Sequence, residues 1–195
     1  DYFYKEYLKD ILVDLGFTEI FSYPFLSEID LKEAQIESKD LIEVANPIQS
    51  ENKYMRNSLI PGLLKTVAKN PTFDPILIFE LGNIFTQETE TSSLAIATSG
   101  KNAKKIVNDV VEKLAEISEV SKDEFQINER NREELNRFKI RKPVTYTLEI
   151  PVAFLIENLR KKDINLVLKT STKKIHYRPI SKYPSIVRDL AFIVD

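Results

Sequence analysis

The side chains of this sequence that could take part in catalysis are few and widely spaced. Arg56 could bind an anion, Glu80 could act as a general base, and His176 is the single histidine. Because an unpaired charge in the apolar run ILIFELGNIF is costly, the alternative for Glu80 is a structural carboxylate paired in a sheet. Arg56 is then a partner for Glu80 or Glu51, or it orients a partner subunit. No serine–acid pair stands near His176, so we expect it not to be catalytic.

The residue types that are missing exclude several kinds of site. There is no cysteine, which removes disulfides, thiolate zinc sites and cysteine nucleophiles, and one histidine leaves no poly-histidine metal site. The four glycines are far apart, so none can build a phosphate-binding loop with another. They are Gly16, Gly62, Gly82 and Gly100.

The elements that would position these residues indicate an α+β fold. Apolar spacing predicts helices over 2–15 and 101–117, and Pro61 fits the first turn of a helix that follows it. Residues 75–86 and 93–99 are expected to form a hairpin in the core of an antiparallel sheet. Further strands are expected over 18–26, 40–45 and 143–150, and a helix over 151–161. Ser27 and Asp30 have the spacing of a capping box, and residues 121–142 are expected to be a surface helix or a loop.

The charge is distributed unevenly along the chain. Residues 1–100 carry 8 basic and 16 acidic side chains, whereas residues 160–188 carry nine basic side chains and one acidic one. Such a basic tract is either a solvated surface or a contact for a polyanion. No apolar run approaches the roughly 20 residues that span a bilayer, and the N-terminus lacks a signal-peptide pattern. We therefore expect a cytoplasmic protein without a membrane partner.

Three ordered blocks of the sequence resemble one known family. NPIQSENKYMRNSLIPGLLKTVAKN followed by ILIFELGNIF, the preceding LGFTEIFSYPFLSE, and YRPISKYPSIVRDLAFIVD are similar to the bacterial-type phenylalanyl-tRNA synthetase beta subunit. The resemblance implies a degenerate, noncatalytic copy of the class II synthetase fold over residues 1–160. It also implies a basic linker and the first strand of a ferredoxin-like anticodon-binding domain over 161–195. Because 195 residues is far short of a whole beta subunit, we expect an excised piece.

The resemblance also implies partners and ligands. The family's beta subunit packs on a catalytic alpha subunit in a heterotetramer of two alpha and two beta chains, and the complex uses ATP, Mg and tRNA. We expect no cofactor and no metal on this chain and no catalytic residue, because Arg56 is the one candidate for the phosphate-binding arginine and no glycine-rich ATP segment exists. The interface is expected on the N-terminal helix, the strand around Pro24 and residues 46–70.

The resemblance assigns two groups of site residues. Structural or subunit-interface roles are expected for Pro24, Asn46, Pro47, Glu51, Arg56, Ser58, Pro61, Gly62, Glu80 and Gly82. Contacts to tRNA are expected for Lys173, Lys174, Lys182 and Arg188. The alternative function is a stand-alone nucleic-acid-binding module that uses the basic tract 160–188. Its few interleaved aromatics argue against base stacking.

Overall fold

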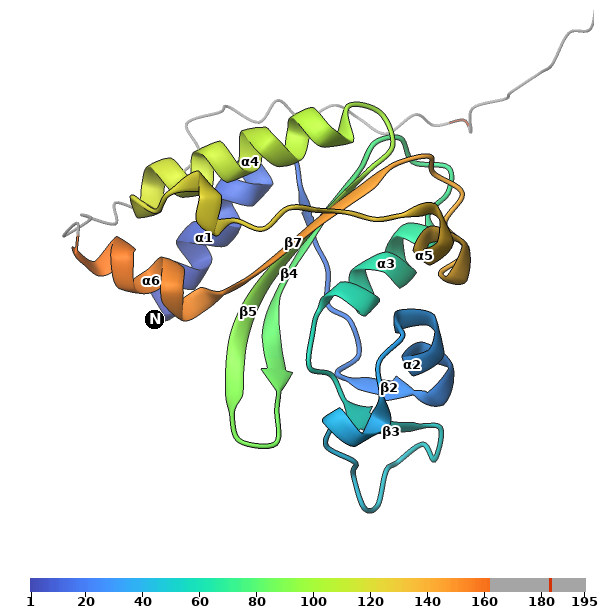
Figure 1. Cartoon of the computed structure of the whole chain (residues 1–195). Helices are drawn as coiled ribbons and strands as arrows, with labels where there is room; N and C mark the ends of the chain where they lie inside the picture. The colour runs from blue at the N-terminus through green and yellow to red at the C-terminus, as the bar shows by residue number, and fades with distance from the viewer. Residues whose placement is uncertain (162–182, 184–195) are drawn as a thin grey trace, which may run out of the picture.

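The centre of the molecule is a five-stranded mixed sheet with helices on both faces (Figure 1). The computed structural model describes residues 1–161 and Tyr183. The expected α+β fold is present. In spatial order the strands are β1 (Thr18–Glu19), β4 (Ile76–Phe85), β5 (Glu90–Ser99), β7 (Thr145–Pro151) and β6 (Asn128–Glu129).

The sheet is antiparallel except at one edge. The hairpin of β4 and β5 was expected, and β7 pairs with β5 in the same antiparallel manner. β1 instead runs parallel to β4, with Thr18 opposite Ile78. The chain between these two strands is long enough to cross over, which a parallel pair requires. The expected antiparallel core is therefore present, and β1 adds one parallel strand at its edge.

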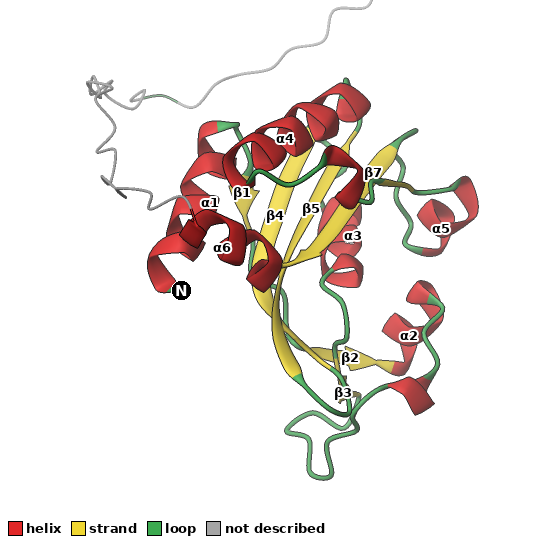
Figure 2. Cartoon of the chain, turned by 60° about the vertical axis from the view of Figure 1, so that its left-hand side comes forward, coloured by secondary structure: helices red, strands yellow, loops and turns green. Residues whose placement is uncertain are grey.

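Helices cover the two faces of the sheet unequally (Figure 2). Alternate residues of β4 point to opposite faces: Phe79 packs in one apolar cluster and Ile78 in the other. The first cluster includes α1 (Tyr2–Asp14), α4 (Ala103–Ser118) and α6 (Val152–Lys161), while the second includes α3 (Ile60–Lys69) and α5 (Arg132–Arg137).

A small two-stranded sheet projects from the main body. β2 (Phe25–Ser27) pairs with β3 (Asn52–Met55), and the helix α2 (Glu28–Ala34) and the 3-10 turn η1 (Ser38–Asp40) complete it. The expected strand over 40–45 is wrong, because only Glu43 forms a bridge, opposite Tyr54. The expected strand over 18–26 is split into β1 and β2.

The polar segment after α4 contains more structure than its composition suggested. It forms the 3-10 turn η2 (Lys122–Glu124), the edge strand β6 and the short helix α5. Phe125, Leu135, Phe138 and Ile140 are buried within it. The segment therefore lies largely on the surface, as expected, but it also adds an edge strand to the sheet and four apolar side chains to the core.

The second predicted domain, residues 161–195, lies outside the described residues except for its first residue and Tyr183. The boundary at 160 stays a prediction. Among the described helices, none is long and apolar enough to cross a membrane.

Candidate functional site

The most distinctive feature of the interior is a buried ion pair between Arg56 and Glu80. Arg56 Nη1 lies 2.7 Å from Glu80 Oε1, and the two side chains are 8% and 2% exposed. Arg56 follows β3, and Glu80 lies in the middle of β4, on the face that α3 covers. The pairing that the cost of a buried charge led us to expect is therefore present, and Glu51 is not the partner.

Ser22 and Asn83 complete the hydrogen bonding of this pair. Ser22 donates to Glu80 through its hydroxyl (2.6 Å) and its backbone N–H (3.2 Å). Arg56 Nη1 also donates to Ser22 Oγ at 2.9 Å, and Arg56 Nε donates to the carbonyl of Asn83 at 2.9 Å. We call these four residues the Arg56–Glu80 network. Sequence reasoning missed Ser22, because a lone serine between strand residues has no distinguishing pattern.

Two of the four glycines make room for the network. A Cβ on Gly82 would lie 2.5 Å from Arg56 Nη2 and 3.2 Å from Glu80 Oε1. A Cβ on Gly62 would lie 2.4 Å from Ser22 Oγ. Because these neighbours are held by hydrogen bonds, neither position can accept a larger residue without displacing the network.

A second polar contact holds the start of α3. Glu149 of β7 accepts a hydrogen bond from the Ser58 hydroxyl (2.5 Å) and another from the backbone N–H of Leu59 (2.9 Å). Pro61 lies in the first turn, as expected. Glu149 thus satisfies a free N–H at the helix start and places negative charge at its positive end. Sequence reasoning missed Glu149, which is 90 residues from Leu59.

Of the remaining predicted residues in the described part of the chain, Pro24 lies beside the network and the others lie apart from it. The carbonyl of Pro24 accepts a bond from the N–H of Arg56, so this proline borders the network. Asn46 and Glu51 are exposed and Pro47 is partly exposed, all in the loop before β3. Lys173, Lys174, Lys182 and Arg188 lie outside the described residues.

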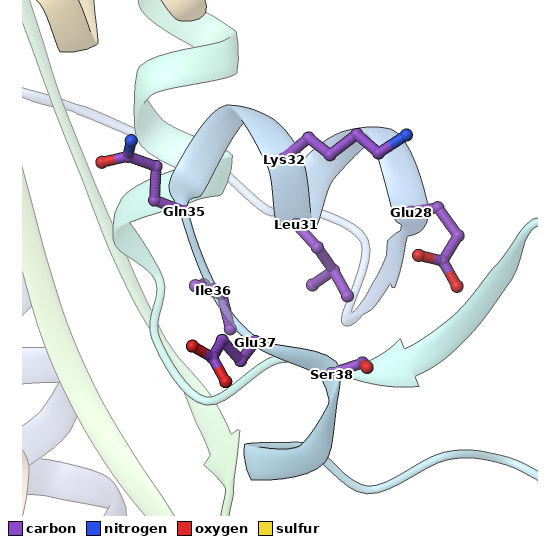
Figure 3. Close-up of a pocket in the computed structure, with 7 residues that line it drawn as sticks. All are labelled: Glu28, Leu31, Lys32, Gln35, Ile36, Glu37 and Ser38. Atoms are coloured by element: carbon purple, nitrogen blue, oxygen red, sulfur yellow. The ribbon is translucent and has the colours of Figure 1, made fainter.

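Two of the hollows in the described part of the chain are lined by polar side chains, and neither brings together a reactive set. The first, about 330 Å³, lies beside α2, with Leu31 pointing into it in Figure 3. The second, about 390 Å³, is bordered by Glu149 and Arg130. Arg130 is held by Thr147 Oγ1 at 2.7 Å and Glu134 at 3.1 Å, and Glu149 is held by the start of α3. These groups stabilise the walls of the hollow.

Arg56 is the residue that would have to contact a phosphate of ATP if this site bound it. Its guanidinium already donates to Glu80, Ser22 and Asn83, and the residue is 6% exposed. It is therefore not available to contact a phosphate. Arg56 therefore supports the fold and does not supply the phosphate-binding arginine that adenylation chemistry would require.

Large apolar side chains are exposed along α1 and the segment after β1. Phe21 is 80% exposed, and its ring centroid lies 6.0 Å from Lys9 Nζ of α1. Lys9 also pairs with Glu19 of β1 at 2.9 Å, so helix and strand edge form one surface. Burial lowers the pKa of Lys9, but hydrogen bonds to Glu19 and Glu6 outweigh it and raise the pKa above its usual value. We call this surface the apolar edge. It comprises Tyr2, Phe3, Val13, Leu15, Phe21 and Tyr23.

Comparison with known protein families decides where this arrangement belongs. Residues 2–139 match the family described as the phenylalanyl tRNA synthetase beta chain CLM domain. The chain belongs to this family. The phenylalanine–tRNA ligase beta subunit of Aquifex aeolicus is 28% identical over 96% of the chain, and that of Dehalococcoides mccartyi is 26% identical over 98%. The chain spans 27% of the length of each of these two relatives.

A shorter match agrees with the family, and a solved structure agrees with the fold. The beta subunit of Solibacter usitatus is 38% identical over 76 residues, which is 38% of the chain and 10% of that relative. Among solved structures, pyrrolysyl-tRNA synthetase from Desulfitobacterium hafniense superposes with a TM-score of 0.65. The match covers 82% of this chain and 68% of that one at 16% identity, which shows a shared fold. This family member therefore has the α+β fold of a class II synthetase.

Proposed function

We propose that the chain is the noncatalytic synthetase-like part of a phenylalanine–tRNA ligase beta subunit and that it docks a catalytic alpha subunit. In this proposal ATP and Mg act in the alpha subunit, within a cytoplasmic complex of two alpha and two beta chains. The family supports the first part. The observation that carries the second is the apolar edge, whose large exposed side chains are typical of a protein–protein contact.

The buried network refines which residues would face the partner. Arg56, Glu80, Gly62 and Gly82 are occupied with one another, so we assign them a structural role. The apolar edge takes the interface role instead, together with the strand edge at β1. An edge strand offers unpaired backbone groups to a partner, and here exposed aromatics lie beside it.

Co-expression with the alpha subunit of the same organism tests this proposal. The Phe21→Ser/Tyr23→Ser variant is expected to lose most of the co-purifying alpha subunit, because aromatic side chains carry much of an interface's energy. The matched control is Phe73→Ser, which changes an aromatic of similar exposure (63%) before β4. Far-UV circular dichroism checks that the variants stay folded.

The outcomes separate clearly. Loss of co-purification in the double variant but not in the control supports docking through the apolar edge. Equal recovery of the alpha subunit with all three proteins would contradict it. If the unaltered chain recovers no alpha subunit, the docking role itself is wrong.

A further inference from the structure

One end of the main sheet carries a dense group of basic side chains. Residues 100–105 and 137–143 together contain seven basic residues and no acidic one. The first segment leads from β5 into α4, and the second connects α5 to β7. Both lie at the same end of the sheet in Figure 1.

Contacts around Asp74 hold the two segments together. Asp74 Oδ1 accepts a hydrogen bond from the N–H of Lys101 at 2.8 Å and lies 3.7 Å from Lys142 Nζ. The N–H of Gly100 donates to the carbonyl of Val144 at 3.0 Å, and Arg132 Nη1 donates to the carbonyl of Lys142. We call the resulting surface the basic end. Arg137 is left out because it pairs with Glu133, and Arg132 is included through its contact with Lys142. The basic end comprises Lys101, Lys104, Lys105, Arg132, Lys139, Arg141 and Lys142.

Most of the charge of the basic end is not neutralised by the protein. Lys104, Lys105, Lys139 and Arg141 are exposed, and the described part of the chain provides none of them with an ion pair. Three acidic side chains of the neighbouring elements have other partners: Glu133 pairs with Arg137, Glu134 with Arg130, and Glu129 with the hydroxyl of Tyr146. Asp109, four residues after Lys105 on α4, is the exposed acidic side chain nearest in sequence to these lysines, so the balance of charge at this end stays positive. A concentrated positive field therefore faces solvent.

The position of two of these lysines cannot be explained by helix stability. Lys104 and Lys105 lie in the first turn of α4, which contains no acidic residue. Cations at the start of a helix oppose its dipole and cost stability. Residues that work against local stability are expected where a function requires them.

We infer that the basic end binds the phosphate backbone of RNA. Several cations spread along one edge match successive phosphates, and the exposed Phe73, one residue before Asp74, offers a ring on which an unpaired base can stack. An anionic membrane is the poorer match. The buried face of α4, from Val107 to Leu114, is enclosed in the core, and a helix lying in a membrane surface would need that apolar face free. This RNA contact does not depend on docking to the alpha subunit.

The test measures binding of the full 195-residue chain to an unmodified tRNA transcript over a range of salt concentrations. The Lys104→Glu/Lys105→Glu variant is expected to bind on the order of tenfold more weakly at low salt. The slope of log affinity against log salt should fall by about two, one for each lost phosphate contact. The control, Lys39→Glu/Lys122→Glu, makes the same change in net charge at exposed lysines elsewhere and should bind almost as the unaltered chain does.

Further measurements distinguish the remaining outcomes. A milder variant, Lys139→Ser/Arg141→Ser, should weaken binding in the same direction without reversing any charge. All variants keep the basic tract 160–188, so equal affinities for the basic-end variants and the control would overturn the inference. It would also be overturned if the unaltered chain bound no transcript, or if the variants lost binding to phosphatidylserine vesicles but not to RNA. Co-purification with the alpha subunit should not change in the basic-end variants, which separates this inference from the docking proposal.

Discussion

Arg56 and Glu80 connect parts of the chain that are distant in sequence. Glu80 belongs to the central sheet. Arg56 directly follows β3 of the small sheet, and Ser22 lies in the loop that connects β1 to β2. Each of these residues satisfies the polar atoms of the other two. The free energy of the network is therefore shared, and removing a single member leaves the others buried without a partner.

This sharing predicts a strong coupling between Arg56 and Glu80. Glu80→Leu and Arg56→Met alone should each lower the free energy of unfolding by about 3–5 kcal/mol, because each leaves an uncompensated buried group. The double variant should lose less than the sum of the two, by about 0.5–3 kcal/mol. Urea unfolding of the four proteins, followed by circular dichroism, measures this coupling.

An exposed ion pair provides the control for this cycle. Lys122 and Glu112 are paired at 2.6 Å with side chains 59% and 61% exposed, and replacing them should change stability little. Strictly additive losses at Arg56 and Glu80 would show that the two side chains do not act as a unit.

The free-energy cost of burying an unpaired charge explains which of these residues could be predicted from the sequence. A carboxylate within an apolar strand needs a partner wherever the strand is placed, so the pairing of Glu80 could be expected. Ser22 could not, because its role depends on a contact with a residue 58 positions away. Gly62 and Gly82 were noticeable, but their use as space beside Ser22 and Arg56 became evident only from the fold.

At the scale of single elements, α2 shows how local and distant contacts combine. Ser27 and Asp30 form the capping box that the sequence predicted, since both partners lie within one helical turn. Asp30 also pairs with Lys65 of α3. Burial raises the pKa of Asp30, but hydrogen bonds from Lys65 and Ser27 outweigh it and hold the pKa below the usual value of 3.8.

The lowered pKa of Asp30 predicts a loss of stability in acid. When the pH falls below about 5, the unfolded chain takes up the proton first, so the contribution of Asp30 disappears as the pH passes through its folded pKa. Asp30→Asn should therefore cost about 1–2 kcal/mol at pH 7, and the difference from the unaltered chain should shrink toward pH 3. Urea unfolding at a series of pH values checks this. Asp40→Asn, an exposed carboxylate, is the control, and a difference for Asp30→Asn that does not change with pH would contradict the assignment.

Contacts that reach across the sheet explain where the predicted elements failed. The strand expected over 18–26 is interrupted because the N–H of Ser22 bonds to Glu80 instead of to a neighbouring strand. Residues 40–45 have an alternating pattern, but β3 offers them only two backbone bonds, Val44 to Lys53 and Met55 to Ile42. Glu149 was overlooked for the same reason: its function as a cap depends on α3 lying above β7.

At the scale of the whole molecule, the exposed features are distributed over separate regions. The apolar edge lies along α1 and β1, whereas the basic end lies where β4 begins and β5 ends. The Arg56–Glu80 network lies mostly in the interior, and it meets the apolar edge at Ser22, between Phe21 and Tyr23. A protein partner and an RNA could therefore bind at the same time, and variants of one surface should leave the other intact.

The packing of α1 against α6 brings residues 1 and 160 close together. Asp1 contacts Arg160, and Leu8, Leu12, Leu155 and Leu159 share one apolar cluster.

This closeness predicts that residues 1–161 tolerate circular permutation. A short glycine–serine linker from 161 to 1, with new ends in the exposed loop 46–51, should give a folded protein with a similar urea midpoint. A permutant opened within β4, between Leu81 and Gly82, should not fold. Because residues 1 and 160 lie side by side, segments joined to the two ends of this region would start from neighbouring points on its surface.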